Sequence, residues 1–372
     1  MGVDETRNGT VTGLRVLHLP YNIVSQISVT VRGLRAIGVE ARGLVLAPST
    51  DVIPEHTDVE SLPAAPALPR SPTWAFTHAL RYSKLMSAIA WADVLHWHYG
   101  ELVLRNGFDL RWARFLRKPG IAEFWGCDIR VSEIEAADNP YWVRCVPAKY
   151  QAVRTLERSR WTQAIFSDAG FHCTVPDKAM LDYVQRDLFP TVHMVRQRLM
   201  ISDYTPKPPY SNRRRPVLVH SPSDPELKGT RFVLAAIEKL RTKFDFEFRL
   251  VHNVPHRKAL DIMSEADIFI DQLVIGAHGL AALEAMALAK PVVCYLKPSA
   301  VAWYPPELPI VNANPDNIRD ALETLITNGH RRHELGLRGR TYVEKYHDSI
   351  KIAQDLKSLY QQLIDERKAY RV

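Results

Sequence analysis

The segment GAHGLAALEAMALAKPVV, residues 276–293, combines a glycine-rich turn, an apolar helix and a buried strand, and its one carboxylate is Glu284. No other ionisable side chain lies in the predicted helix, Leu280–Ala289. A buried carboxylate without a partner costs several kcal/mol, so something must compensate its charge. The candidates are the hydroxyl pair of a ligand, a structural ion pair and a partly exposed helix face. Because Glu284 lies little more than one turn from the helix N-terminus, where anions bind, we favour the ligand.

The turn before this helix is suited to an anion. Gly276 and Gly279 allow the backbone to approach a ligand closely, and His278 lies between them. The helix that begins at Leu280 presents unpaired amides at its N-terminus, and these attract negative charge. A purely structural role, in which the glycines only shape a turn, is equally compatible with the residues.

A second turn, HSPSDPELKGT at residues 220–230, follows another predicted strand. It carries the hydroxyls of Ser221 and Ser223, and it carries Lys228 just before a Gly-Thr pair that opens a helix. A lysine at this place can direct a point charge at a diphosphate. Taken alone, Lys228 is more typical of a solvated loop lysine.

Polar residues also follow two predicted strands in the N-terminal half. His98 ends the sequence HWH, and Asp128 and Arg130 follow the next strand in FWGCDIR. Because ligands bind at the carboxyl ends of parallel strands, these side chains are candidates to contact one. Asp128 and Arg130 can hydrogen-bond hydroxyls or phosphates, or they can pair with each other and brace the loop. We expect His96 to be a core histidine.

Apolar strands alternate with amphipathic helical stretches along the chain, which is typical of α/β folds with parallel sheets. We predict strands at Leu14–Leu19, Ala41–Leu46, Asp93–Trp97, Ile121–Trp125, Gln163–Phe166, Val217–His220, Phe246–Val251 and Asp267–Ile270. We predict helices at Ser25–Ile37, Trp74–Ala92, Thr230–Leu240, His256–Ala266 and along 315–369, and a long surface loop at Ala47–Thr73.

The Pro-rich basic stretch Tyr204–Pro216 lacks periodicity and indicates a linker between two domains. We therefore expect an N-terminal Rossmann-like domain over residues 1–205, a linker over 206–216 and a second Rossmann-like domain over 217–350. A C-terminal helix over 351–372 is expected to pack back on the N-terminal domain. The two doubly wound domains would face a central cleft.

Composition limits the class of protein. A chain of 372 residues with 46% hydrophobic and 24% charged residues suits a globular protein with more than one core. No apolar run is long enough to span a bilayer and the N-terminus lacks the regions of a signal peptide, so we expect a cytoplasmic protein. The four cysteines form no CxxC pair, which argues against a structural zinc site. The net charge of +7 favours anionic ligands, but no nucleic-acid-binding motif accompanies it.

The segments HSPSDPELKGT and DIFIDQLVIGAHGLAALEAMALAKPVV resemble the nucleotide-sugar domain of retaining GT-B glycosyltransferases of family 4. The tail segments LPIVNANPDNIRDALETLI and RGRTYVEKYHD are similar too, so the resemblance covers most of residues 216–366. Over residues 14–200 it rests on LRVLHLP, ADVLHWHYGE and EFWGCDIR. The EAMA and KPVV motifs are fairly specific for this fold and for nucleotide-sugar binding, but not for a particular sugar.

The resemblance implies roles in donor binding. In that family two glutamates bracket seven residues, and the second, which binds the ribose hydroxyls, corresponds to Glu284. Lys228 matches the lysine that contacts the diphosphate, and Gly279 matches the glycine before the helix. The remaining donor-binding candidates are Ser221, Ser223, His278, Leu280, and, in the loop that contacts the base, Asn253 and Val254.

The chain also departs from the family pattern. The first family glutamate falls at Gly276 and is absent. The arginine that usually accompanies the lysine would fall near Pro222 or Ser223 and is missing, and the closing glycine of the GKPV motif is Ala289. These departures concern the sugar and the diphosphate, and they put the chemistry in question.

The resemblance implies that the N-terminal half binds the acceptor. The stretch YNIVSQ, residues 21–26, replaces the family's first glycine-rich loop, so Asn22 and Gln26 are candidates to bind hydroxyls. Trp125 occupies about the place where many members have a histidine near the sugar, and Arg130 follows it as another acceptor candidate. The residues expected to take part in catalysis are Lys228, His98 and Asp128.

The resemblance implies a retaining transfer of a sugar from a UDP- or GDP-type donor to a hydroxyl of a glycan, glycolipid or small molecule. No cofactor is expected, and no metal, because no DxD-like motif stands out at a strand end. Two alternatives stay open: a pseudo-glycosyltransferase that couples a nucleotide-activated non-sugar, and a non-catalytic nucleotide-sugar-binding protein. Nucleic acid is not an expected partner.

A cluster of basic residues allows a peripheral contact with the inner face of a membrane. It consists of Arg111, Arg114, Arg117 and Lys118. These side chains are candidates to face anionic lipid, and the alternative is a solvated helix face.

Overall fold

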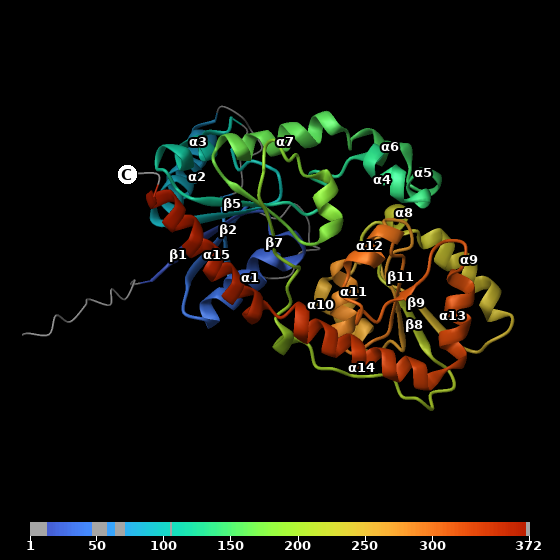
Figure 1. The fold of residues 1–372 in the computed structure, drawn as a ribbon. Coiled ribbons are helices and arrows are strands. Elements are labelled where there is room, and N and C mark those ends of the chain that lie inside the picture. The colour runs from blue at the N-terminus through green and yellow to red at the C-terminus, as the bar shows by residue number, and fades with distance from the viewer. Residues whose placement is uncertain (1–12, 47–57, 64–70, 105, 370–372) are drawn as a thin grey trace, which may run out of the picture.

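The chain forms two parallel β-sheets, each covered by helices on both faces (Figure 1). This computed structural model describes residues 13–46, 58–63, 71–104 and 106–369. The strands of the first sheet are β1 (Arg15–Pro20), β2 (Glu40–Val45), β3 (Val59–Ser61), β4 (Val94–His98), β5 (Gly120–Glu123), β6 (His172–Val175) and β7 (Val192–Met194). Their order is β3-β2-β1-β4-β5-β6-β7, and every pair is parallel.

The second sheet contains β8 (Val217–His220), β9 (Glu247–Leu250), β10 (Ile268–Ile270), β11 (Val292–Cys294) and β12 (Val311–Asn312). Its order is β12-β11-β10-β8-β9, and it is also parallel throughout. The strand order changes direction within both sheets, as in doubly wound domains. The predicted α/β fold with two such domains is therefore confirmed.

Helices separate most of the strands in sequence, and the last three follow the final strand. The first half has η1 (Ile23–Ser25), α1 (Gln26–Ala36), α2 (Pro72–Trp91), α3 (Phe108–Phe115), α4 (Ser132–Asp138), α5 (Pro140–Cys145), α6 (Ala148–Ala152), α7 (Leu156–Asp168), η2 (Lys178–Tyr183) and η3 (Ile201–Asp203). The second half has α8 (Pro225–Lys228), α9 (Thr230–Arg241), α10 (His256–Ser264), α11 (Leu280–Ala287), α12 (Pro298–Trp303), α13 (Ile318–Thr327), α14 (Gly329–Tyr346) and α15 (Ser349–Ala369).

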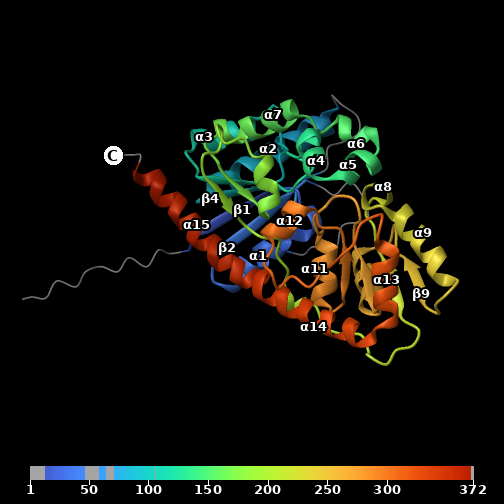
Figure 2. The same cartoon turned by 45° about the vertical axis from the view of Figure 1, so that its right-hand side comes forward.

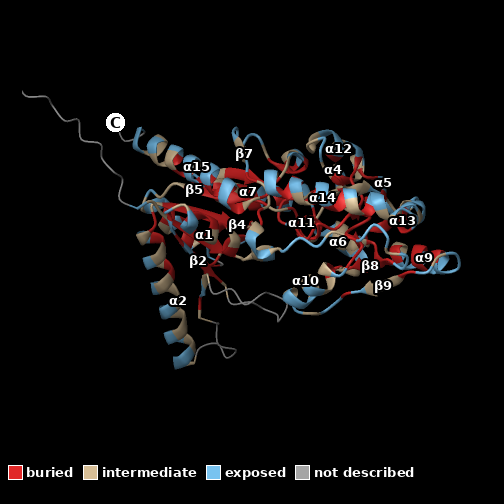
Figure 3. Cartoon of the chain, turned by 90° about the horizontal axis from the view of Figure 1, so that it is seen from below, coloured by how far each residue is buried: buried red, intermediate tan, exposed pale blue. Residues whose placement is uncertain are grey.

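Each sheet is sandwiched between two helical layers. In the first domain α1 and α15 pack on one face, and α2, α3 and α7 pack on the other. In the second, α10, α11 and α14 lie opposite α9 and α13. The central strands β1, β4, β5, β6, β8, β10 and β11 are therefore buried on both faces, whereas edge strands such as β3 and β9 are partly exposed (Figure 3). None of the helices within the described ranges is long and apolar enough to cross a membrane.

Two predictions of local structure were wrong. Gln163–Phe166 belongs to helix α7, and the strand that follows it is β6. A run of four residues is too short to distinguish the helical period from the strand period, and Gly170 separates the two elements. The predicted loop Ala47–Thr73 lies partly outside the described residues, but it includes strand β3, and α2 already begins at Pro72.

A buried ion pair joins the first sheet to its helices. Glu123, at the end of β5, accepts two hydrogen bonds from the Arg198 guanidinium, at 2.8 Å and 2.7 Å. Both side chains are fully buried. The Arg198 guanidinium also donates to the Thr30 hydroxyl of α1. The Gln26 side-chain amide donates to Arg198 O at 3.1 Å and accepts from the Arg198 amide at 3.0 Å. The ion pair thus fixes α1 and the segment after β7 on the sheet.

Three buried histidines extend this cluster along β1 and β4. Nε2 of His96 and Nδ1 of His98 lie 3.1 Å and 3.0 Å from Glu123 Oε2. His96 is also 2.6 Å from the Tyr360 hydroxyl of α15, and His98 Nε2 is 2.9 Å from Nδ1 of His18. His96 is therefore a core histidine with polar partners, as predicted.

The chain crosses between the domains twice, and the two crossings are hydrogen-bonded to each other. The amide of Leu199 donates to His347 O at 2.8 Å, and the amide of Ser349 donates to Leu199 O at 2.9 Å. The second crossing leads into α15, which leaves the C-terminal domain and lies against α1 in the N-terminal domain (Figure 2). The C-terminal helix is thus a structural part of the first domain.

Helices α4–α6 connect the two domains on the opposite side (Figures 1 and 2). The Tyr141 hydroxyl donates to Asp316 at 2.7 Å, and the Tyr150 hydroxyl donates to Asp224 at 2.6 Å. An apolar cluster that includes Trp142 and Tyr295 lies beneath these contacts. The cleft between the domains is therefore bounded by contacts on both sides.

We predict that Arg198→Met destabilises the first domain by about 3–5 kcal/mol, because it leaves the Glu123 carboxylate buried without its cation. Chemical denaturation followed by circular dichroism measures the change. The matched control is Arg160→Met, which removes an arginine from an exposed pair with Asp187 and should leave the unfolding midpoint almost unchanged. An Arg198→Met protein as stable as this control would contradict the structural role of the pair.

Candidate functional site

A cavity of about 390 Å³ opens at the carboxyl ends of the strands of the second sheet. We call it the α11 cavity. Many of the residues predicted to bind a ligand line its wall, namely Ser221, Ser223, Lys228, Asn253, Val254, Leu280 and Glu284, and Asn22 reaches it from the N-terminal domain. The structure therefore brings together residues from four separate segments of the sequence.

Glu284 is 5% exposed and has two partners in the protein. Its Oε1 accepts from His256 Nε2 at 2.8 Å and from the Tyr204 hydroxyl at 3.1 Å. Burial lowers the pKa of His256, but the hydrogen bond and the negative charge of Glu284 together exceed this effect and raise it above its usual value. Among the described residues no hydrogen bond reaches Oε2, and the carboxylate remains on the cavity wall.

Sequence reasoning did not identify His256 and Tyr204 as the partners of Glu284. His256 begins α10, and Tyr204 lies in the Pro-rich stretch predicted as a linker. Both residues are distant from Glu284 in sequence and approach it only in the folded protein. The ion-pair interpretation of the lone acid is thus correct in part. A second acceptor oxygen is still available for a ligand.

Unusual backbone conformations gather at the same cavity. Val24 and Ser25 have φ of 40° and 66°, and Asn253 has φ of 54°. A positive φ is costly for residues other than glycine, and such strain is typical of functional sites. Asn22 stabilises its loop by a hydrogen bond from its amide to Ser28 Oγ at 2.9 Å. The loop 22–25 is therefore held in a particular shape against the α11 cavity.

The N-terminus of α11 lies between Lys228 and a buried carboxylate. The Gly279 amide donates to Asp271 Oδ2 at 2.7 Å. A Cβ atom at Gly279 would lie 3.3 Å from Lys228 Nζ, so a larger residue here would press on the lysine. The next amides of α11 have no carbonyl one turn back to bond and can serve an anion.

Lys228 is positioned by the short helix α8. Asp224 caps this helix by accepting from the amides of Glu226 and Leu227 at 2.9 Å and 3.1 Å. The Lys228 ammonium contacts the Gln272 side-chain oxygen. No carboxylate in the described part of the chain forms an ion pair with Lys228. Its charge is therefore available to an anionic ligand.

Gly276 occupies a position where a side chain does not fit. Its φ is 81°, and a Cβ atom there would lie 2.9 Å from Cβ of Lys297. Lys297 is buried and pairs with Glu135 at 3.4 Å and Asp138 at 3.3 Å. At the position where the resembling family has a glutamate, this chain therefore has a glycine with a lysine packed on it.

A second cavity, of about 190 Å³, lies between the domains. We call it the interdomain cavity. Trp125 and Arg130 line it from the N-terminal domain, and His278, Gly279 and Lys297 line it from the C-terminal domain. Gln272 also lines it, so the contact between Lys228 and Gln272 marks the boundary with the α11 cavity.

Three of the predicted site residues line neither cavity as the structure describes them. His98 is fully buried, and Trp125 stacks on it with ring centroids 6.4 Å apart. Burial and the electrostatic effect of His96 lower the pKa of His98 to about 3. Asp128 accepts from the amides of Trp125, Gly126 and Ile129 and so shapes their loop. Gln26 is bonded to the main chain at Arg198. Catalytic or binding roles for these residues stay predictions.

Arg130 does not pair with Asp128. Its guanidinium lies 2.6 Å from Glu135 Oε2. Burial lowers the pKa of Arg130, but the charges of Glu135 and its neighbours exceed this effect and raise it. The alternative of a mutual Asp–Arg brace is therefore wrong, because each side chain stabilises the loop through a different partner.

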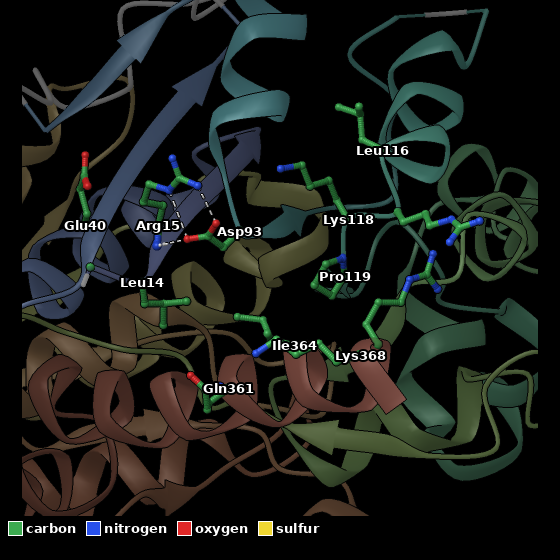
Figure 4. Close-up of a pocket in the computed structure, with 13 residues that line it drawn as sticks. Leu14, Arg15, Glu40, Asp93, Leu116, Lys118, Pro119, Gln361, Ile364 and Lys368 are labelled. Atoms are coloured by element: carbon green, nitrogen blue, oxygen red, sulfur yellow. Dashed lines mark hydrogen bonds and ion pairs between the residues drawn. The ribbon is translucent and has the colours of Figure 1, made fainter. Parts of the chain in front are cut away.

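A larger cavity, of about 760 Å³, lies at the amino ends of the strands of the first sheet (Figure 4). Arg15 and Asp93 form an ion pair in it at 2.7 Å, and Lys118, Gln361 and Lys368 lie around them. Ligands of open parallel sheets bind at the opposite, carboxyl ends of the strands. The α11 and interdomain cavities, which lie at those ends, are therefore the candidate ligand sites.

Comparison with solved structures identifies the fold. The sucrose-phosphate synthase of Thermosynechococcus elongatus aligns with a TM-score of 0.63 at 17% identity, over 95% of this chain and 99% of that one. HepE of Anabaena, crystallised with UDP, aligns with a TM-score of 0.59 at 11% identity, over 94% of this chain and 100% of that one. WaaG, a glycosyltransferase involved in lipopolysaccharide biosynthesis, aligns with a TM-score of 0.55 at 12% identity, over 93% of this chain and 99% of that one.

At these identities the likeness establishes the fold, and the chain has the GT-B architecture of two Rossmann-like domains facing a cleft. Neither a protein-family model nor a curated protein sequence matches the chain. The activity must therefore be argued from the two cavities.

Proposed function

We propose that this protein transfers a sugar from a nucleoside diphosphate sugar to an acceptor hydroxyl. The observation that carries the proposal is the combination of Glu284, Lys228 and the N-terminus of α11 on the wall of one cavity. A carboxylate oxygen suits a pair of ribose hydroxyls, and a lysine beside helix amides suits a diphosphate. HepE, which shares the fold, was crystallised with UDP and with UDP-glucose, and this supports the same class of donor.

In this proposal the base of a UDP- or GDP-type donor lies against Asn253 and Val254, and the ribose lies against Glu284. Lys228 and the first amides of α11 hold the diphosphate and stabilise the charge that develops on it. A bond forms between the acceptor hydroxyl oxygen and the anomeric carbon as the bond to the diphosphate oxygen breaks. The diphosphate leaves with that electron pair and takes up the hydroxyl proton. Retention of the anomeric configuration is supported only by the resemblance, and the anomeric coupling constant of the product would measure it.

We predict that one nucleoside diphosphate or its sugar raises the melting temperature of the wild-type protein in a saturable way. At 100 times the Kd the expected stabilisation is about 2.7 kcal/mol. Glu284→Ala should lose most of this shift, measured against its own ligand-free melting temperature. The control Glu265→Ala removes an exposed carboxylate that pairs with Lys207 and should retain the shift.

The outcome of this panel separates the alternatives. A shift without turnover for any acceptor would favour a non-catalytic nucleotide-sugar-binding protein. A shift with the nucleotide and transfer of a non-sugar group would favour a pseudo-glycosyltransferase. The absence of any shift in the wild-type protein would contradict the donor site.

We further propose that charge on the diphosphate is stabilised without a metal ion. We predict that EDTA leaves turnover unchanged, and that Lys228→Ala lowers kcat by about 100-fold or more, since it removes a charge that acts on the leaving group. Both are measured with the donor identified by the panel. The melting temperature of the variant should stay near that of wild type. Loss of activity with EDTA, restored by Mg²⁺ or Mn²⁺, would contradict metal independence.

We also propose that helices α2 and α3 contact an anionic membrane surface. Phe115 is 74% exposed beside the exposed Arg111 and Arg114, and α2, which carries the exposed Phe76, projects from the domain (Figure 3). Exposed aromatic rings next to cations suit the interface of an anionic bilayer. Lys118 is not included in this membrane-facing surface, because its ammonium donates to Ala90 O at 2.8 Å.

Co-sedimentation with vesicles of phosphatidylcholine, with and without phosphatidylglycerol, tests this contact. We predict binding to the anionic vesicles that falls in Phe115→Ser and persists in Trp161→Ser, a control ring that is also exposed but lies on α7. Equal sedimentation of the wild-type protein with neutral and anionic vesicles would contradict the role of the arginines.

A further inference from the structure

Arg154 is a buried cation without a carboxylate partner. Its side chain is 7% exposed and lines the interdomain cavity. The guanidinium donates to Tyr150 O and, at 3.4 Å, to Cys127 Sγ, and its Nε has no partner among the described residues. The buried Arg332 also has an Nε without a partner, but its two terminal nitrogens donate to three backbone carbonyls, whereas Arg154 has one carbonyl and one sulfur. An arginine is always charged, so the position of Arg154 calls for an anion.

Other residues that line the same cavity also have buried polar atoms without partners. Nε1 of Trp125 and Nε1 of Trp142 are buried hydrogen-bond donors without an acceptor, and both residues line the interdomain cavity. Arg154 lies 5.8 Å from the ring of Trp142. Buried donors are almost always satisfied in proteins, so their concentration here indicates a missing acceptor. Gln197 Oε1 on the same wall is a buried acceptor without a donor.

Arg154 stands out among the charges on the cavity wall. Arg130 and Lys297 are already paired with Glu135 and Asp138, so Arg154 is the cation on this wall without an ion pair among the described residues. The carboxylate on the lining is Asp177, which accepts from the Met180 amide at 3.2 Å and caps η2. The unpaired Arg154 guanidinium and the two indole donors suit an oxyanion, and Gln197 Oε1 suits a hydroxyl beside it.

We propose that the interdomain cavity binds an oxyanion, a phosphate or a carboxylate, that is carried by the sugar acceptor. The proposal rests on the proposed function, because the two cavities meet at the contact of Lys228 with Gln272 and at Gly279. An acceptor anchored at Arg154 thus has its hydroxyls next to the place expected for the donor sugar. The indole groups of Trp125 and Trp142 and the Arg154 guanidinium hold the oxyanion.

Calorimetric titration of the full chain tests the proposal with glucose, glucose 6-phosphate, glucuronate and inorganic phosphate, each in the presence and absence of the nucleotide. We expect one of the anionic sugars to bind on the order of tenfold to 100-fold more tightly than glucose. Arg154→Gln should remove this preference. The control Arg158→Gln changes an exposed arginine nearby and should keep it.

A second variant tests the same site independently if Arg154→Gln does not fold. Trp125→Phe keeps one aromatic ring and removes the indole N–H together with the five-membered ring that carries it, so it should weaken binding of the anionic sugar by a smaller factor while the nucleotide shift stays intact. If glucose and the anionic sugars bind equally well to the wild-type protein, the oxyanion site is refuted. Inorganic phosphate binding without any sugar preference would also refute a site for an acceptor.

The two proposals fail separately. Binding of the anionic sugar without any response to nucleotides would leave the oxyanion site standing and overturn the donor site. A thermal shift with a nucleotide, but no preference for anionic sugars over glucose, would leave the donor site standing and overturn the oxyanion site. Binding of a soluble sugar phosphate identifies a free acceptor, whereas binding only of an alkyl-linked phosphosugar in micelles identifies a lipid-linked one, and both support the oxyanion site.

Discussion

The N-terminal domain depends on the need to satisfy one buried carboxylate. Glu123 is the last residue of β5 and is buried, and the Arg198 guanidinium neutralises its charge through a bidentate hydrogen bond. Burial opposes ionisation, but the charge and hydrogen bonds of Arg198 keep the pKa of Glu123 well below its usual value. Removing two such charges from water is expensive, so the pair tolerates only a narrow geometry. That geometry fixes α1, the first interdomain crossing and, through His96 and Tyr360, helix α15.

The histidines of this cluster are best described as neutral hydrogen-bonded groups. A proton on Nδ1 of His98 would face Glu123 and would leave Nε2 to accept from His18. Burial lowers the pKa of all three rings. The cluster thus continues the polar network across β1 and β4. Because η1 and the strained loop 22–25 precede α1 directly, the network also determines how this loop meets the α11 cavity.

The sequence predicted the fold and much of the α11 cavity because both follow from local patterns. Alternating strands and helices define parallel sheets, and residues after successive strands must gather at one edge. The partners of Glu284 were not predictable in this way, since Tyr204 and His256 approach it through the packing of separate segments. Arg154 was missed for the same reason, because only its burial makes its charge unusual. The error at Gln163–Phe166 arose where the pattern was too short to fix a period.

The paired crossings at Leu199 and His347 have a mechanical consequence. Two chain segments hydrogen-bonded side by side suit a hinge, because such a pair would permit rotation about one axis and resist sliding. Helices α4–α6 lie on the far side of the cleft, where a rotation at the crossings would move the domains farthest apart (Figure 1). An opening there would break the hydroxyl–carboxylate contacts of Tyr141 and Tyr150 and would also separate the buried Lys297 from Glu135 and Asp138. The cost of separating these charges therefore favours the closed arrangement of the two domains.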